Sequence, residues 1–86
     1  MTDATTALTT PQALEMLAGC FMEPSENLHP DRARGDIAGW DSMGALLLIA
    51  ELDERFGIEL SADASRGMKS VSDALSFLRL NGVLAD

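Results

Sequence analysis

Ser42 is the residue whose type and position most clearly indicate chemistry, because it lies where a polar segment meets the apolar run of residues 45–50. Asp41 precedes it, and aspartate is a favoured N-cap because its carboxylate accepts from free N–H groups of the first helical turn. Ser42 is therefore predicted to stand in that first turn. There, N–H groups and the positive end of the helix dipole favour a negatively charged substituent such as phosphate. The Ser42 hydroxyl is a candidate attachment point, and a simple helix cap is the alternative interpretation.

The other reactive side chains offer little for catalysis. A hydrolytic serine needs a base within hydrogen-bond reach and an oriented third group. The sole histidine, His29, lies in a different segment, and Ser42 is not part of a Gly-x-Ser-x-Gly turn. Cys20 is predicted to be a packing residue that lies off the core-facing stripe of its helix. One cysteine and one histidine cannot supply the ligands of a usual zinc site, so neither a metal nor an enzymatic activity is predicted.

The chain of 86 residues is strongly acidic, with 14 Asp and Glu against 6 Lys and Arg and a net charge of −8. This charge repels nucleic acids and anionic membranes and attracts basic protein surfaces. A hydrophobic content of 47% suits one small folded domain. The first 20 residues hold no Lys or Arg and no continuous apolar segment, and no membrane-length apolar stretch occurs. We therefore expect a cytoplasmic, monomeric protein with protein partners, without nucleic acid or membrane partners.

Hydrophobic periodicity and helix-end signals predict four helices and no strand of any length. Thr10 and Pro11 indicate an N-cap followed by proline at the first helical position. Residues 23–40 contain Pro24 and Pro30, which bar a continuous helix, so a long loop is predicted there. The predicted helices are residues 11–22, 42–56, 61–66 and 71–80. The expected fold class is all-α, a four-helix bundle with a short third helix and a long loop between the first two helices.

The folded domain is predicted to span residues 9–82, with 1–8 as a flexible tail and 83–86 as a C-terminal tail. Its core should draw on one face of each helix. In the second helix, a rotation of about 100° per residue places Leu48 and Leu52 toward the core. The other predicted core residues are Leu14, Leu17, Ala18, Phe21, Leu28, Ile37, Ala45, Ile49, Phe56, Ile58, Leu60, Met68, Val71, Ala74, Leu75 and Leu78.

Two residues beside the candidate serine have two interpretations each. Trp40 either caps the core at the end of the long loop or flanks a group attached to the serine. Gly44 either clears space beside the serine or is simply tolerated near a helix end. In the loop itself, His29, Arg32 and Arg34 are expected to be solvent-exposed.

The segment Trp40-Asp41-Ser42-Met43, with the apolar helix behind it, resembles the acyl carrier protein family, whose Asp-Ser-Leu motif carries 4'-phosphopantetheine on the serine. Downstream segments are also similar to that family, and the resemblance covers about residues 14–80. These segments are Phe56-Gly57-Ile58-Glu59-Leu60 and Met68 with Ser70-Val71. Met43 stands where leucine is commoner, a mild departure because the two side chains have similar volumes.

The resemblance implies a carrier function for Ser42. A phosphopantetheinyl transferase would join the phosphopantetheine of coenzyme A to Ser42, and the terminal thiol of this arm would hold acyl groups as thioesters. Ser42 would be modified and would catalyse nothing. The implied partners are the transferase, against which Asp41 is placed, and acyl-loading and acyl-processing enzymes with basic docking surfaces.

The docking surface is predicted on the outward face of the second helix, because this face carries apolar residues where a bundle helix should be polar. The predicted anchors are Met43, Leu46, Leu47 and Ala50, with Glu51, Asp53 and Glu54 steering the partner.

Three departures from housekeeping fatty acid carriers favour a specialised, polyketide-like pathway. Leu47 stands where such carriers usually have glutamate, and Arg55 stands where they have a third acid. A tryptophan at the position of Trp40 resembles the sequences of carriers from specialised pathways. The alternative function is a helical protein interaction module that receives no prosthetic group and uses the same apolar face.

Overall fold

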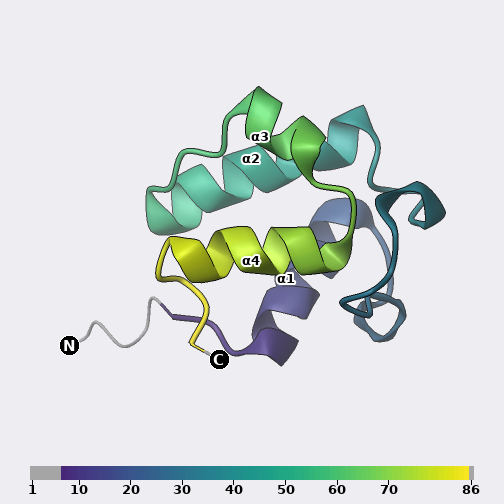
Figure 1. Ribbon diagram of the computed structural model, residues 1–86, viewed down its shortest axis with the longest axis horizontal. Helices are drawn as coiled ribbons and strands as arrows, with labels where there is room; N and C mark the ends of the chain where they lie inside the picture. The colour runs from purple at the N-terminus through teal and green to yellow at the C-terminus, as the bar shows by residue number, and fades with distance from the viewer. Residues whose placement is uncertain (1–6, 86) are drawn as a thin grey trace.

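Capping side chains set the starts of the α-helices in the computed structural model, which describes residues 7–85 (Figure 1). The helices of this described part are α1 (Thr10–Phe21), α2 (Ser42–Phe56), α3 (Ala62–Gly67) and α4 (Val71–Leu80). Two 3-10 turns, η2 (Ser25–Asn27) and η3 (Arg34–Asp36), lie in the long loop. The predicted all-α fold with a short third helix and a long first loop is confirmed.

The start of α1 differs by one residue from the prediction. Thr9, not Thr10, is the N-cap: the Thr9 hydroxyl accepts from the Gln12 N–H, and the Gln12 side chain accepts from the Thr9 N–H. This reciprocal capping box satisfies two donors, whereas a cap at Thr10 offers no matching partner three residues on, where alanine stands. Pro11 still falls in the first turn, where its missing N–H costs nothing.

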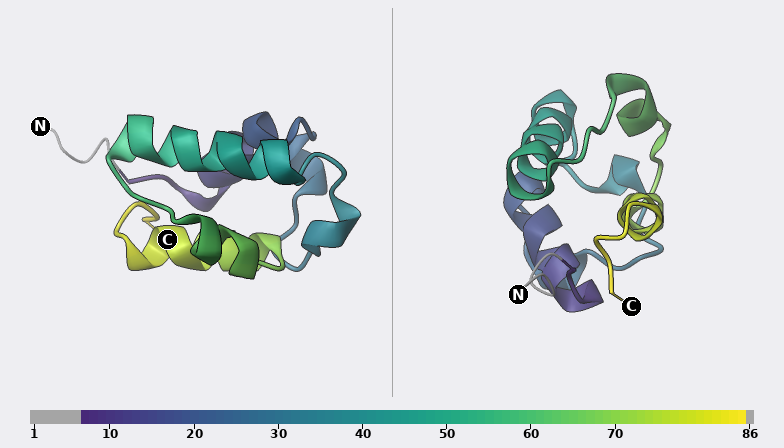
Figure 2. Two further views of the ribbon diagram at one scale, coloured as in Figure 1. Left: turned by 90° about the horizontal axis from the view of Figure 1, so that it is seen from above. Right: turned by 90° about the vertical axis from the view of Figure 1, so that its left-hand side faces the viewer.

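The helices α2 and α4 lie on opposite sides of the core and run along the long axis of the molecule (Figures 1 and 2). The helix α1 packs against α2, and α3 also contacts α2. The long loop lies at one end of the bundle, the right-hand end in Figure 1. Within residues 7–85, no helix has the length and apolar character needed to cross a membrane.

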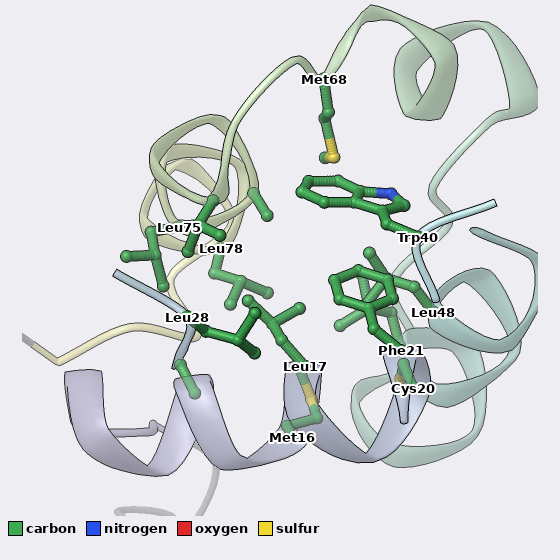
Figure 3. Packing of buried hydrophobic residues seen from close by; sticks show 14 of the residues in the cluster. Met16, Leu17, Cys20, Phe21, Leu28, Trp40, Leu48, Met68, Leu75 and Leu78 are labelled. Carbon is green, nitrogen blue, oxygen red and sulfur yellow. The ribbon is translucent and has the colours of Figure 1, made fainter. Parts of the chain in front are cut away.

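The core is one cluster to which every α-helix except α3 contributes fully buried apolar side chains (Figure 3). The ring of Phe21 stacks on Trp40 with centroids 4.6 Å apart and 15° between the planes. Met68 lies over the other side of the Trp40 indole in Figure 3. The core-facing residues predicted for α2 and α4 are buried or packed against this cluster.

The buried face of α1 is broader than its sequence pattern predicts. Cys20 lies in the core, with 7% of its surface exposed, so its predicted place off the core stripe is wrong. Ala13 and Met16 are buried as well, while Leu14 is only partly buried. The physical reason is that α1 is covered from two directions, by α2 and by η2, so more than one stripe is removed from water.

Two glycines allow the chain to pass closely between the end of α1 and the start of α2. A Cβ on Gly39 would lie 1.5 Å from the Phe21 carbonyl oxygen, and one on Gly44 would lie 2.0 Å from the Gly39 carbonyl oxygen. Neither distance is sterically possible. Gly44 is thus needed because its buried side faces the backbone of Gly39. This role differs from both interpretations of the sequence, which were space beside the serine and simple tolerance near a helix end.

The long loop is held by arginine side chains that the sequence analysis expects to be solvated. Arg32 donates to the carbonyls of Asn27 (2.6 Å) and Asp36 (2.7 Å) and pairs with Glu23 at 3.6 Å. Because the guanidinium is a rigid fork of donors, it can tie several loop carbonyls together. The expectation for Arg32 is therefore wrong, whereas His29 is exposed as predicted.

A second arginine joins this loop to α3. Arg34 Nη1 donates to the carbonyls of Ser65 (2.9 Å) and Met68 (3.3 Å), and its backbone N–H donates to Lys69 at 2.8 Å. Arg34 is only partly exposed, so it too differs from the expected solvated side chain. The predicted anchors Leu28 and Ile37 are buried, as expected.

The folded part extends beyond the predicted boundaries at residues 9 and 82. Leu8, Val83 and Leu84 are buried in the core cluster, and Leu8 forms a parallel bridge with Leu84. The Leu8 N–H donates to Val83 and the Ala85 N–H donates to Leu8. The two ends of the described part therefore pair with each other, and this long-range contact cannot be recognised from short apolar segments of the sequence. The rest of the predicted N-terminal tail, residues 1–6, and the terminal residue 86 lie outside the described residues.

Candidate functional site

Ser42 is the first residue of α2 and is exposed. Its position is fixed from the N-terminal side by the Asp41 carboxylate, which accepts from the Gly44 N–H at 3.0 Å. One residue earlier, the Trp40 side chain is buried with 4% exposure, and its backbone N–H donates to Ile37 at 3.0 Å. The Ser42 hydroxyl is thus presented to solvent at the helix start, on a rigid support.

Trp40 belongs to the core, in agreement with the first of its two interpretations. Its indole stacks on Phe21, and the guanidinium carbon of Arg34 lies 5.2 Å from the indole centroid. The indole N–H has no hydrogen-bond partner among the described residues. Trp40 therefore anchors the end of the long loop, directly before Asp41 and Ser42, to the core, and removal of this large side chain would leave a large void.

A cavity of about 260 Å³ opens beside Ser42, between α2 and α3. It combines apolar side chains of α2 with cationic and polar side chains of the loop and α3. Its lining residues are Arg34, Ser42, Ala45, Leu46, Ile49, Ala62, Ser65 and Arg66. Sequence reasoning assigns a role to Ser42 and Leu46 among these residues and to none on the polar side of the cavity, because Arg34 and Ser65 are 31 residues apart and meet only after folding.

The outward face of α2 is exposed as predicted. The exposed fractions are 63% for Met43, 60% for Leu46 and 43% for Leu47. Ala50, Asp53 and Glu54 are exposed too. These side chains leave an apolar strip beside Ser42 that continues toward acidic residues at the end of the helix.

Glu51 differs from the other predicted steering acids. Its carboxylate pairs with Arg55 at 3.3 Å, one helical turn further on, and it is only partly exposed. Glu51 also lines a hollow between α1 and α2, of about 340 Å³, together with Leu47 and Cys20. Because a nearby cation screens a carboxylate, Glu51 contributes less than Asp53 or Glu54 to the field felt by a partner.

The Cys20 thiol next to this hollow is inert for a physical reason. Burial raises the pKa of the Cys20 thiol from 9.0 to about 11, with the Glu51 charge adding to the rise and Arg55 opposing it. The thiolate is the reactive form, so a thiol with this pKa reacts slowly near neutral pH. Cys20 is a packing residue, as predicted, although on a different face of α1.

We expect alkylation of Cys20 by iodoacetamide at about pH 8 to be at least about a hundredfold slower in the native protein than in urea, because both the thiolate fraction and access fall. Stability should also decline between pH 9.0 and about 11, the interval between the two pKa values. In that interval the unfolded chain has released the thiol proton and the folded chain has not. Urea midpoints measured across this range, against Cys20→Ala, check the second effect. Equal alkylation rates in buffer and urea would contradict burial of the thiol.

The chain was compared with known proteins. No family model matches it. It is similar to a curated acyl carrier protein of Solidesulfovibrio magneticus, with 35% identity over 51 residues. The predicted resemblance to the acyl carrier protein family is confirmed. The matched segment is 59% of this chain and 65% of that relative, so the chain spans slightly less than two thirds of the relative's length.

Proposed function

We propose that this chain is an acyl carrier whose Ser42 bears 4'-phosphopantetheine. The observation that carries the proposal is the exposed serine at the first position of α2, behind an aspartate N-cap, in a chain similar to a named acyl carrier protein. The site fits such an arm: the helix start favours the phosphate charge, and the adjoining cavity offers two guanidinium groups. When bound, the arm supplies a thiol that forms thioesters with acyl groups.

The attachment step needs an external enzyme. The Ser42 oxygen forms a bond to the phosphorus of coenzyme A next to the pantetheine, the bond from this phosphorus to the adenosine 3',5'-bisphosphate breaks, and the hydroxyl proton passes to a base of the transferase. Within residues 7–85 the sole histidine, His29, is an exposed loop residue at a distant sequence position. Ser42 therefore acts as the acceptor of a group and does not catalyse a reaction.

The test is the intact mass of the protein after incubation with coenzyme A and several phosphopantetheinyl transferases of broad specificity. We expect a gain equal to one phosphopantetheine. No gain with any transferase would contradict the carrier function. It would favour the alternative of a helical interaction module, which uses the apolar face of α2 without a prosthetic group.

Replacing Asp41 by asparagine is expected to slow this loading while leaving the fold intact. Asparagine still caps the helix through its side-chain oxygen, so the stability should change by less than about 1 kcal/mol. The carboxylate charge, which the family resemblance places against the transferase, is removed. Loading rates at low and high salt, with urea midpoints as the control for folding, measure the effect. A rate equal to wild type would exclude the charge of Asp41 from transferase recognition.

The exposed face of α2 is proposed as the docking surface for the transferase and for acyl-loading and acyl-processing enzymes. Met43, Leu46, Leu47 and Ala50 provide apolar contacts that a partner can bury. Asp53 and Glu54, exposed and without an ion pair among residues 7–85, provide charge for steering, while the Glu51 carboxylate pairs with Arg55 at 3.3 Å. Rim charges of this kind mainly change association rates, and buried apolar anchors mainly change dissociation rates.

Leu47→Glu should weaken docking without unfolding the domain, because Leu47 is 43% exposed. Burying one leucine contributes about 1.5–3 kcal/mol, so kcat/KM for loading is expected to fall about ten- to a hundredfold. Leu80→Glu is the matched control, since Leu80 is 86% exposed at the end of α4, far along the chain from Ser42. An unchanged kcat/KM for Leu47→Glu, or an equal loss for Leu80→Glu, would place the docking surface elsewhere.

We also propose a specialised, polyketide-like pathway. An apolar Leu47 on the exposed face and an arginine paired with one of the acids of α2 favour recognition by apolar contact over recognition by charge. A cytoplasmic location and a monomeric state complete the proposal and rest on composition alone. The mass of the acylated species isolated from the native host tests the pathway. An acyl group with keto groups or methyl branches supports it, and a saturated straight-chain acyl group contradicts it.

A further inference from the structure

The cations of this acidic chain are concentrated around one hollow of the surface. A cavity of about 660 Å³ opens between the long loop and the segment that joins α3 to α4. Three of the six Lys and Arg residues of the chain line it, namely Arg34, Arg66 and Lys69, and no carboxylate among residues 7–85 does. No residue of α2 lines it either, so this cavity is distinct from the one between α2 and α3 beside Ser42.

Hydrogen bonds hold the two sides of this cavity together. The Arg34 N–H donates to the Lys69 carbonyl at 2.8 Å, which joins the loop to the segment after α3. The Arg34 guanidinium is held as well, because its Nη1 donates to the carbonyls of Ser65 and Met68. The Arg34 charge is therefore in place before a partner binds, and such preorganisation lowers the entropy cost of binding.

The polar groups that line the cavity have donors to spare. Neither Arg34 nor Lys69 has an ion pair among residues 7–85, and the pair between Arg66 and Asp63 is largely exposed and thus weak. The Trp40 indole also lines the cavity with 4% exposure, and its N–H has no partner in the same part of the chain. Ammonium, guanidinium and indole groups can only donate, so the ligand that fits offers acceptor oxygens and negative charge.

The charge of the whole chain indicates the source of this ligand. A net charge of −8 repels a free small anion, whereas a carboxylate on a protein that is already held elsewhere arrives at a high effective concentration. Arg34 and Arg66 also line the cavity beside Ser42, so a protein that reaches the serine comes next to this hollow. The mouth is open on the loop side, because a Cβ on Gly35 would meet no atom within 4 Å.

Charges of opposite sign lie at the two ends of α2. The helix begins next to the long loop and its cationic cavity, whereas the exposed acids Asp53 and Glu54 lie toward the far end (Figure 1). A partner with cations opposite these acids and a carboxylate opposite the cavity matches both ends. The reversed orientation would bring like charges together, so the pair of sites selects one direction of approach to Ser42.

We infer that the cavity between the long loop and the α3–α4 segment is a second docking point, which receives an Asp or Glu side chain of a partner protein. Arg34, Arg66 and Lys69 surround the carboxylate. The inference extends the docking surface proposed for α2, and it does not depend on the phosphopantetheine arm.

The test uses the full, unloaded chain and a hexaglutamate peptide as the probe, at low ionic strength because salt screens exposed charges. Amide NMR signals are followed as the peptide is added to wild type, Lys69→Gln and Arg79→Gln. The two substitutions change the net charge equally, and Arg79 lies near the far end of α4, about 15 Å from Lys69 along the helix. Both side chains are exposed, so both variants are expected to fold. Arg34 is left unchanged because it holds the long loop.

Hexaglutamate should shift the amide signals of residues 34–38 and 66–69 in wild type. Lys69→Gln should raise the apparent Kd for the peptide about two- to fivefold more than Arg79→Gln does, the loss expected for one exposed charge pair. Hexalysine, the peptide of opposite charge, should instead shift the signals around Asp53 and Glu54.

Three results would overturn the second docking point. The first is an absence of shifts at residues 34–38 and 66–69 with hexaglutamate. The second is an equal loss of affinity for Lys69→Gln and Arg79→Gln, which would indicate a response to net charge alone. The third is the same set of shifts with inorganic phosphate at an equal concentration of negative charge, which would identify a site for small anions. None of these results involves loading of Ser42, so each leaves the carrier function intact.

Discussion

Leu52→Ala is expected to lower the free energy of unfolding by about 2–5 kcal/mol. Leu52 is 1% exposed near the middle of the core face of α2, so the substitution removes buried surface and leaves a cavity. Because small domains are often only about 5–15 kcal/mol more stable than the unfolded chain, this loss should be plain in the urea midpoint.

Leu46→Ala is the matched control for Leu52→Ala. It makes the same chemical change in the same helix, at a side chain that is 60% exposed. Its stability should change by no more than about 0.5 kcal/mol. If Leu52→Ala and Leu46→Ala had the same urea midpoint, the orientation of α2 described above would be wrong, and with it the face assigned to docking.

Gly39→Ala is expected to destabilise the domain by an amount similar to the loss of Leu52. The new methyl group would lie 1.5 Å from the Phe21 carbonyl oxygen, a backbone atom that cannot rotate away. Overpacking of a core typically costs about 1–3 kcal/mol, and we expect a loss at or above the top of that range. To relieve this clash, the backbone at residue 39 would have to move away from α1, and the adjacent Trp40 would move with it. Because the stacked Trp40 indole anchors the chain just before α2, loading of Ser42 should fall together with stability.

Gly35→Ala separates this steric effect from the general effect of removing a loop glycine. Gly35 lies in the same loop, and a Cβ there would meet no atom within 4 Å. Its stability should remain within about 0.5 kcal/mol of wild type, or rise slightly because alanine restricts the unfolded chain. Equal urea midpoints for the two variants would contradict the close approach of Gly39 to α1.

Local signals made α2 predictable. Asp41 caps its start, Gly57 ends it in the left-handed conformation with φ of 67°, and the apolar spacing between them defines two faces. Each of these signals lies within a few residues of the feature that it determines. The exposed anchors Met43 and Leu47 followed from the same spacing, so the candidate docking surface could be located before folding was considered.

Contacts between distant segments were not predictable from local patterns. The two carbonyls that Arg34 bonds lie 31 and 34 residues away, and Leu8 pairs with residues at the opposite end of the chain. The burial of Cys20 likewise depends on two neighbours that cover α1 from different sides. The cavity beside Ser42 therefore appeared only in the folded structure, although the serine itself was identified from its neighbours.

The central claim is that Ser42 carries the phosphopantetheine arm, and peptide mass spectrometry after loading tests it most directly. Wild type, Ser42→Ala and Ser76→Ala are incubated with coenzyme A and a transferase, where Ser76 is an exposed serine of α4 that serves as the matched control. We expect the added mass on the peptide containing Ser42 in wild type and Ser76→Ala, and no added mass in Ser42→Ala. An arm on any other residue, or an undiminished gain in Ser42→Ala, would contradict the claim.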